Sequence, residues 1–174
     1  MEKLKEVEAE ILKGKTVEEI LKHLSWREFE EFCACVFEAN GFKVVRNLKF
    51  RSFSKRFEID VLAIRGTLVI CADCKHWSIK TGSPSTLAEA IQKQVERAKG
   101  VLCYLTKNSR LIAYKPLKEI LVIPLIVSLY ERGIKLHEGV PVVPIFKLNS
   151  FLNELPIYVE DLRIVKWEEL RQAC

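Results

Sequence analysis

The chain is poor in the residues that mark fibrous, disordered and membrane-spanning proteins. Its 174 residues include only 7 Gly and 6 Pro, which excludes collagen-like and low-complexity chains, and 49% are hydrophobic, which excludes intrinsic disorder. The longest apolar run, residues 120–130, is too short to span a bilayer. Residues 1–15 alternate charged and apolar side chains, so we expect no signal or transit peptide. These features predict one compact cytoplasmic domain without membrane contact, in which all six cysteines are reduced thiols.

Acidic residues are missing from one segment of the chain. Between Phe42 and Phe57 the sequence has no acid and six basic residues, namely Lys43, Arg46, Lys49, Arg51, Lys55 and Arg56. The net charge of the whole chain is only +5, so the excess positive charge lies in this basic segment (residues 43–56). Phenylalanines interleave with the bases, and a loop of this composition could bind phosphates and stack on or wedge between bases. The alternative is a solvated loop with its phenylalanines packed beneath it.

The hydrophobic pattern predicts a mixed α/β fold. Three helices come first, and capping boxes begin the second at Thr16 and the third at Ser25. A further helix follows from about residue 83. Strands are predicted at 42–45, 57–64, 67–76, 120–130 and 140–146, with a hairpin turn at Arg65-Gly66. The predicted order is α-α-α-β-β-β-α-β-β, a mixed sheet flanked by helices.

The same pattern suggests how the single domain is organised. Residues 1–24 are predicted to form an N-terminal helical segment that packs on the core. The core is expected to comprise residues 25–148, and residues 149–174 form a C-terminal extension.

Two carboxylates and an ammonium group converge within the predicted strand pair. Side chains two apart on a strand share a face, so Asp73 and Lys75 point the same way. A hairpin centred on Arg65-Gly66 places Asp60 opposite or diagonal to Asp73. Buried like charges need a cation between them, and carboxylate oxygens suit Mg²⁺. The alternative is an ordinary outer strand face on which Lys75 bridges two solvated acids.

Two helices could add side chains to this site. On the third helix, Glu30 lies roughly 80° from the centre of the apolar face and Glu31 roughly 180° away, so Glu30 is expected to meet the sheet. It is an ordinary flanking acid if the strand site does not form. On the helix after the strands, Lys93, Gln94 and Arg97 are placed off the apolar face, where they either reach the scissile phosphate or the opposite strand of a bound nucleic acid, or form a solvated surface.

These residues, in this order, resemble the PD-(D/E)xK restriction-endonuclease-like nucleases. The resemblance is carried by Glu30 in SWREFEEF, Asp60 in FEIDVLAI and Asp73-Cys-Lys75 in VICADCKHW, and it covers roughly residues 25–100. The Mrr-like branch is the most similar, with archaeal Holliday-junction resolvases as near relatives. The chain departs from the pattern at Ile59, where the family often has Gly or Pro, and at Asp73, where Glu is commoner.

The resemblance implies a restriction-endonuclease-like core and hydrolysis of DNA phosphodiester bonds by a metal-activated water. The implied cofactor is Mg²⁺, for which Mn²⁺ can substitute. Asp60, Asp73 and the backbone carbonyl of Cys74 would bind the metal, Glu30 would bind it directly or through water, and Lys75 would orient the attacking water. The basic segment and Gln94 would contact DNA, and a homodimer would supply one centre for each strand. A structure-selective junction-resolving nuclease and a catalytically inactive DNA-binding module are the alternatives.

Overall fold

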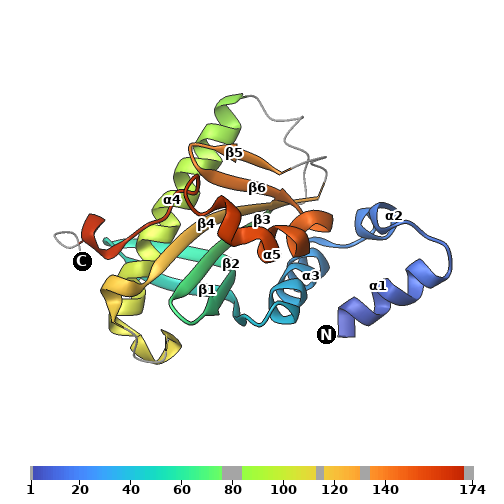
Figure 1. The fold of residues 1–174 in the computed structure, drawn as a ribbon, viewed down its shortest axis with the longest axis horizontal. Helices are drawn as coiled ribbons and strands as arrows, with labels where there is room; N and C mark the ends of the chain where they lie inside the picture. The colour runs from blue at the N-terminus through green and yellow to red at the C-terminus, as the bar shows by residue number, and fades with distance from the viewer. Residues whose placement is uncertain (1, 76–83, 113–115, 130–133, 171–174) are drawn as a thin grey trace.

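One six-stranded mixed sheet forms the centre of the molecule. The computed structural model describes residues 2–75, 84–112, 116–129 and 134–170 (Figure 1). The strands are β1 (Lys43–Ser52), β2 (Lys55–Arg65), β3 (Leu68–Lys75), β4 (Leu121–Ser128), β5 (Lys135–His137) and β6 (Val140–Pro144). They lie in the order β1-β2-β3-β4-β6-β5. The pairs β1–β2, β2–β3 and β5–β6 are antiparallel, whereas β3–β4 and β4–β6 are parallel.

Helices cover both faces of the sheet. They are α1 (Glu2–Leu12), α2 (Val17–Lys22), α3 (Trp26–Ala39), α4 (Pro84–Lys107) and α5 (Leu148–Tyr158). Successive side chains of β3 alternate between two apolar clusters, because a strand presents neighbours to opposite faces. Ile70 and Cys74 pack in the cluster that contains α3 and α5, whereas Val69 and Cys71 pack in the cluster that contains α4. The predicted fold class, a restriction-endonuclease-like mixed sheet flanked by helices, is confirmed.

The N-terminal helices begin where local signals predicted. Capping boxes at Thr16–Glu19 and Ser25–Glu28 open α2 and α3. Val7 of α1 and Leu21 of α2 belong to the same apolar cluster as α3. The division of the chain after residues 24 and 148 stays a prediction.

The basic segment corrects one prediction, because it is a hairpin and not a loop. The strand expected at 42–45 continues to Ser52, and β2 begins at Lys55. In β1 only Phe50 is buried, so the strand lacks the apolar alternation that marks half-buried strands. A second difference is β5, which was missed because three residues are too few to show a period.

The structure also bears on the predicted state of the cysteines and on the expectation that the chain has no membrane-spanning segment. Cys33, Cys35, Cys71 and Cys74 are free and buried, but Cys103 is disulfide-bonded, so the prediction of six reduced thiols is wrong for Cys103. That prediction relied on a reducing compartment, in which disulfide bonds are rare. Within the described ranges, no helix has both the length and the apolar character needed to cross a bilayer. The cytoplasmic location stays a prediction.

Candidate active site

β2 parts from both neighbouring strands at Asp60. The β1–β2 register pairs Leu48 with Ile59 and resumes at Val61, and it omits Asp60 together with Asn47, whose φ is 51°. The β2–β3 ladder also begins only at Val61. At this break a side chain and not the backbone of β2 bonds to β3: Oδ2 of Asp60 accepts a hydrogen bond from the backbone N–H of Cys74 at 2.8 Å. The break therefore anchors the Asp60 carboxylate on β3.

The same break removes Glu58 from the site. Ile59 and Leu62 are three residues apart, yet both pack in the cluster that contains α4, so the strand alternation changes between them. Glu58 is exposed and forms an ion pair with Lys49 at 3.4 Å. Asp60 is half-buried. The two acids are therefore in different environments, although regular alternation would give them one face.

Asp73 is a buried carboxylate held between two cations. Its side chain is 4% exposed, its Oδ2 lies 2.9 Å from Nζ of Lys75, and its Oδ1 lies 2.7 Å from Nη1 of Arg97. Strand periodicity predicted the contact with Lys75. The alternative of a solvated outer face is wrong, because water does not reach the Asp73 carboxylate freely.

α4 buries Gln94, a residue for which the sequence predicted a contact with DNA. Gln94 is fully buried; its Nε2 donates to the carbonyls of Cys71 at 2.6 Å and Leu125 at 3.2 Å, and its Oε1 accepts from Arg97 at 3.2 Å. The predicted DNA contact of Gln94 is therefore wrong, because its amide is already bonded inside the protein. The signal was its spacing, three residues after Ile91 and four before Ala98, both buried in α4.

Glu30 comes to the site from α3. It is buried, 8% exposed, and its Oε1 accepts a hydrogen bond from the indole N–H of Trp26 one turn earlier. Its neighbour Glu31 is directed elsewhere, with its carboxylate 3.8 Å from Arg46. The helical wheel thus predicted correctly which of the two glutamates is buried.

The pKa of Asp60 is strongly perturbed by its surroundings. Burial raises this pKa from its ordinary 3.8 to about 6. The Cys74 N–H lowers it, the carboxylates of Asp73 and Glu30 raise it further, and Arg97 lowers it. Burial and the neighbouring carboxylates both oppose ionisation of Asp60, so an additional cation would stabilise the ionised form.

The donor set fits a hard divalent ion with few protein ligands. Among the described residues, no group of three or more His, Cys, Asp or Glu side chains forms a metal cage. Mg²⁺ is commonly held by only one or two carboxylates and keeps several waters. Asp60 and Asp73 would supply those carboxylates.

Comparison with known proteins decides the family. Residues 21–110, about half of the chain, match the restriction endonuclease family Mrr_cat. The chain belongs to this family. It is also 29% identical over 138 residues to an uncharacterized protein of Archaeoglobus fulgidus, which covers 79% of this chain and 97% of the relative. No solved structure matches the chain significantly. The predicted resemblance is therefore confirmed, and every site residue from Glu30 to Arg97 lies in the Mrr_cat match.

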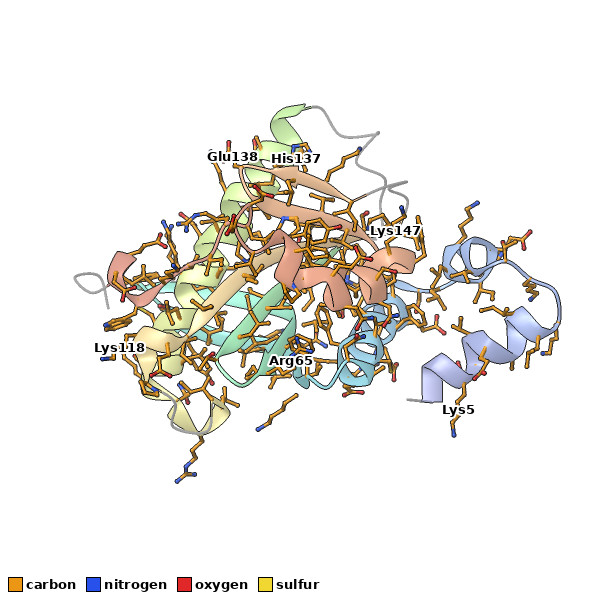
Figure 2. All side chains as sticks on the ribbon, in the orientation of Figure 1. Lys5, Arg65, Lys118, His137, Glu138 and Lys147 are labelled. Atoms are coloured by element: carbon orange, nitrogen blue, oxygen red, sulfur yellow. The ribbon has the colours of Figure 1, made fainter. Side chains whose placement is uncertain are left out.

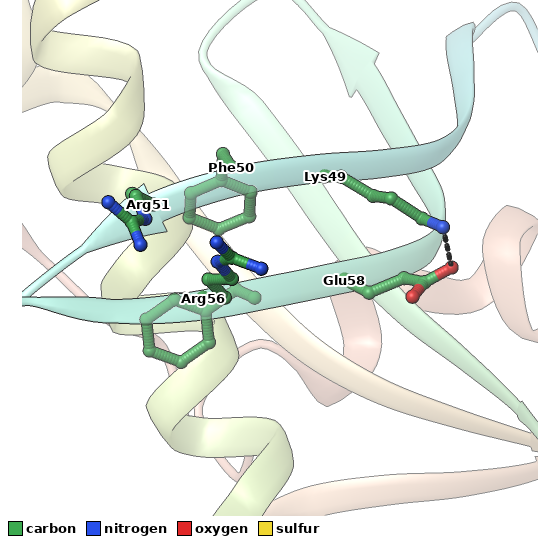
Figure 3. A pocket seen from close by; sticks show the side chains of 6 residues that line it. Lys49, Phe50, Arg51, Arg56 and Glu58 are labelled. Carbon is green, nitrogen blue, oxygen red and sulfur yellow. Dashed lines mark ion pairs between the residues drawn. The ribbon is translucent and has the colours of Figure 1, made fainter.

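In this member of the Mrr_cat family, the basic segment forms the β1–β2 hairpin and carries its positive charges on the surface. All six bases are exposed: Lys43, Arg46, Lys49, Arg51, Lys55 and Arg56. Figure 3 shows the pocket on this hairpin, which Lys49, Arg51, Arg56 and Glu58 line together with the rings of Phe50 and Phe57. At the far end of the hairpin, Lys55 reaches Glu96 of α4 at 3.5 Å. Glu96 precedes Arg97, so the basic hairpin and the carboxylate site border the same turn of α4.

Proposed function

We propose that the protein is a metal-dependent DNA endonuclease that hydrolyses phosphodiester bonds. The supporting observation is the buried Asp73 carboxylate, gripped by Lys75 and Arg97 beside an Asp60 whose pKa is raised to about 6. Strongly perturbed acids that adjoin fixed cations are typical of catalytic sites. Membership of a restriction endonuclease family supports the same reaction class.

Asp60 and Asp73 are the residues that would hold the metal ion. The Cys74 carbonyl would add a third oxygen, and Glu30 would reach the ion directly or through water. A bound Mg²⁺, or Mn²⁺ in its place, would supply Lewis-acid stabilisation of the charge that develops on the scissile phosphate.

Lys75 and Arg97 have separate tasks. The Lys75 side chain is 21% exposed, so its ammonium group can orient the attacking water while Asp73 holds it at 2.9 Å. Arg97 is 28% exposed, and its guanidinium is fixed by Asp73 on one side and Gln94 on the other. It would stabilise negative charge on a non-bridging phosphate oxygen, since its orientation is set before the substrate arrives.

The basic segment would position DNA over this site. Its exposed lysines and arginines would neutralise phosphates, so the affinity for DNA should fall as salt is raised. Cleavage of both strands needs two centres, which a homodimer would supply.

The test is cleavage of supercoiled plasmid in the presence of Mg²⁺. We expect nicked or linear product from the unmodified protein and a rate at least about 100-fold lower for Lys75→Ala. The matched control is Lys118→Ala, because Lys118 is exposed and precedes β4 (Figure 2). Lys75, by contrast, pairs with Ser128 at the opposite end of that strand. Equal rates for Lys75→Ala and the unmodified protein would remove Lys75 from the mechanism.

The DNA substrate separates the remaining possibilities. A panel of four-way junction, flap and linear duplex distinguishes a junction-resolving nuclease from a duplex endonuclease. Binding of DNA without cleavage in Mg²⁺ or Mn²⁺, unchanged by Asp60→Ala, would identify an inactive binding module and refute the proposed activity.

A further inference from the structure

The tip of the β1–β2 hairpin has an unfavourable turn. Phe53 and Ser54 join Ser52 to Lys55, with φ values of 48° and 60°. Two-residue turns with positive φ at both positions favour Asn and Gly, which tolerate the left-handed conformation. Phenylalanine is poorly suited to it, so folding stability does not account for Phe53 at this position.

Phe53 also contributes little to the apolar core. Phe42, just before the hairpin, and Phe50 within it are buried, and Phe57 stacks on Phe50 with ring centroids 5.5 Å apart. Phe53 is 37% exposed. It is therefore the most exposed phenylalanine of this hairpin.

Two arginines repel each other next to the turn. Arg51 lies directly opposite Arg56 in the antiparallel register, and both are exposed (Figure 3). Like charges in such cross-strand positions are destabilising. The next such pair is Lys49 with Glu58, which is an ion pair, but in the described part of the chain no carboxylate pairs with either arginine. A phosphate between the two guanidinium groups would replace the repulsion with charge-assisted hydrogen bonds.

We propose that the hairpin tip binds DNA at an unpaired base, with Arg51 and Arg56 on a phosphate and the Phe53 ring stacked on that base. The inference rests on the proposed DNA substrate and narrows it to nicked, gapped or branched DNA. A base in continuous duplex is already covered by its neighbours, whereas an unpaired base has a free face for an aromatic ring.

The position of the tip relative to the carboxylate site sets a distance. Lys55 lies five strand residues from Asp60, about 17 Å at a rise of about 3.3 Å per residue. Phe53 lies beyond Lys55, so for DNA that runs along the hairpin the unpaired base lies at least about five nucleotides from the cleaved bond, at about 3.4 Å per nucleotide.

The test compares the affinity for two DNAs in a chelator, where no cleavage occurs. Fluorescence anisotropy measures the dissociation constants for a continuous duplex and for the same duplex with a short single-stranded gap. We expect the unmodified protein to prefer the gapped DNA about fivefold or more. Phe53→Asn removes the ring and suits the left-handed turn, so the hairpin still forms and the preference disappears. Phe53→Trp keeps a ring and retains the preference.

A control variant tests whether the preference for gapped DNA is specific to Phe53. Phe146→Asn removes another phenylalanine that is also 37% exposed, and it should leave the preference unchanged. If Phe53→Asn retains the full preference, or if Phe146→Asn loses it equally, the inference is wrong, whereas plasmid cleavage that depends on Lys75 still supports the proposed function. If the unmodified protein binds neither DNA, both proposals fail.

Discussion

Replacing Asp60 with Asn tests the charge balance of the site without reference to catalysis. Asparagine keeps an oxygen that can accept from the Cys74 N–H but carries no charge. The pKa of Asp60 is raised from 3.8 to about 6 in the folded protein. Its contribution to stability is therefore fully present below pH 3.8 and is lost as the pH rises through about 6. A rise of this size corresponds to about 3 kcal/mol in the free energy of unfolding at neutral pH.

The expected result is a pH-dependent gain in stability for Asp60→Asn in the metal-free protein. Relative to the unmodified protein, the variant should gain about 3 kcal/mol between pH 4 and pH 7, or roughly 6–12 °C in Tm for a chain of this size. Urea or thermal unfolding at several pH values, with a chelator present, measures this difference. Adding Mg²⁺ at pH 7 should stabilise the unmodified protein and not the variant, because a ligand stabilises the state that binds it.

Two results would refute this reasoning. A stability difference between the variant and the unmodified protein that stays the same from pH 4 to pH 7 would mean that ionisation of Asp60 does not destabilise the folded protein. Equal stabilisation of both proteins by Mg²⁺ would mean that Asp60 does not bind the ion.

Three further predictions concern α4. Arg97→Ala should raise the affinity for Mn²⁺ about tenfold or more in calorimetry without DNA, because it removes a cation that competes with the metal for the Asp73 carboxylate. The control is Lys93→Ala, and an affinity of Arg97→Ala no higher than that of this control would contradict the competition. Gln94→Leu should lower the free energy of unfolding in urea by about 1–3 kcal/mol, because two buried carbonyls lose their donor; unchanged stability would mean that these bonds contribute nothing. Gly100→Val should cost about 1–3 kcal/mol, because even a Cβ at this position lies 3.2 Å from the Phe57 ring. Ala88→Val, on an exposed turn of the same helix, is its control, and an equal cost for both would show that the ring contact does not matter.

The sequence by itself determined the features that depend on local geometry. The sequence predicted the β2–β3 hairpin and a register that brings Asp60 opposite or diagonal to Asp73, and the pairing of Val61 with Ala72 agrees with this register. The turn itself lies at Gly66-Thr67, one residue later than the predicted Arg65-Gly66, because Arg65 still pairs with Leu68. The two-residue period of strands also predicted that Asp73 and Lys75 share a face. The capping box at Ser25 predicted the start of α3, because its bonds join residues three apart.

Only the tertiary structure decided how distant elements complete the site. Arg97 is 24 residues from Asp73, and their contact depends on how α4 packs on the sheet, which no local pattern specifies. The burial of Gln94 and the break in β2 at Asp60 likewise depend on neighbouring strands and helices. The roles of the phenylalanines were set by the same packing, since Gly100 lets α4 approach Phe50 and Phe57 closely while Phe53 stays at the exposed turn. Local sequence patterns thus predict that the two carboxylates and Lys75 meet. Only the packing of α4 on the sheet brings Arg97 to them, because the residues it contacts are distant in the sequence.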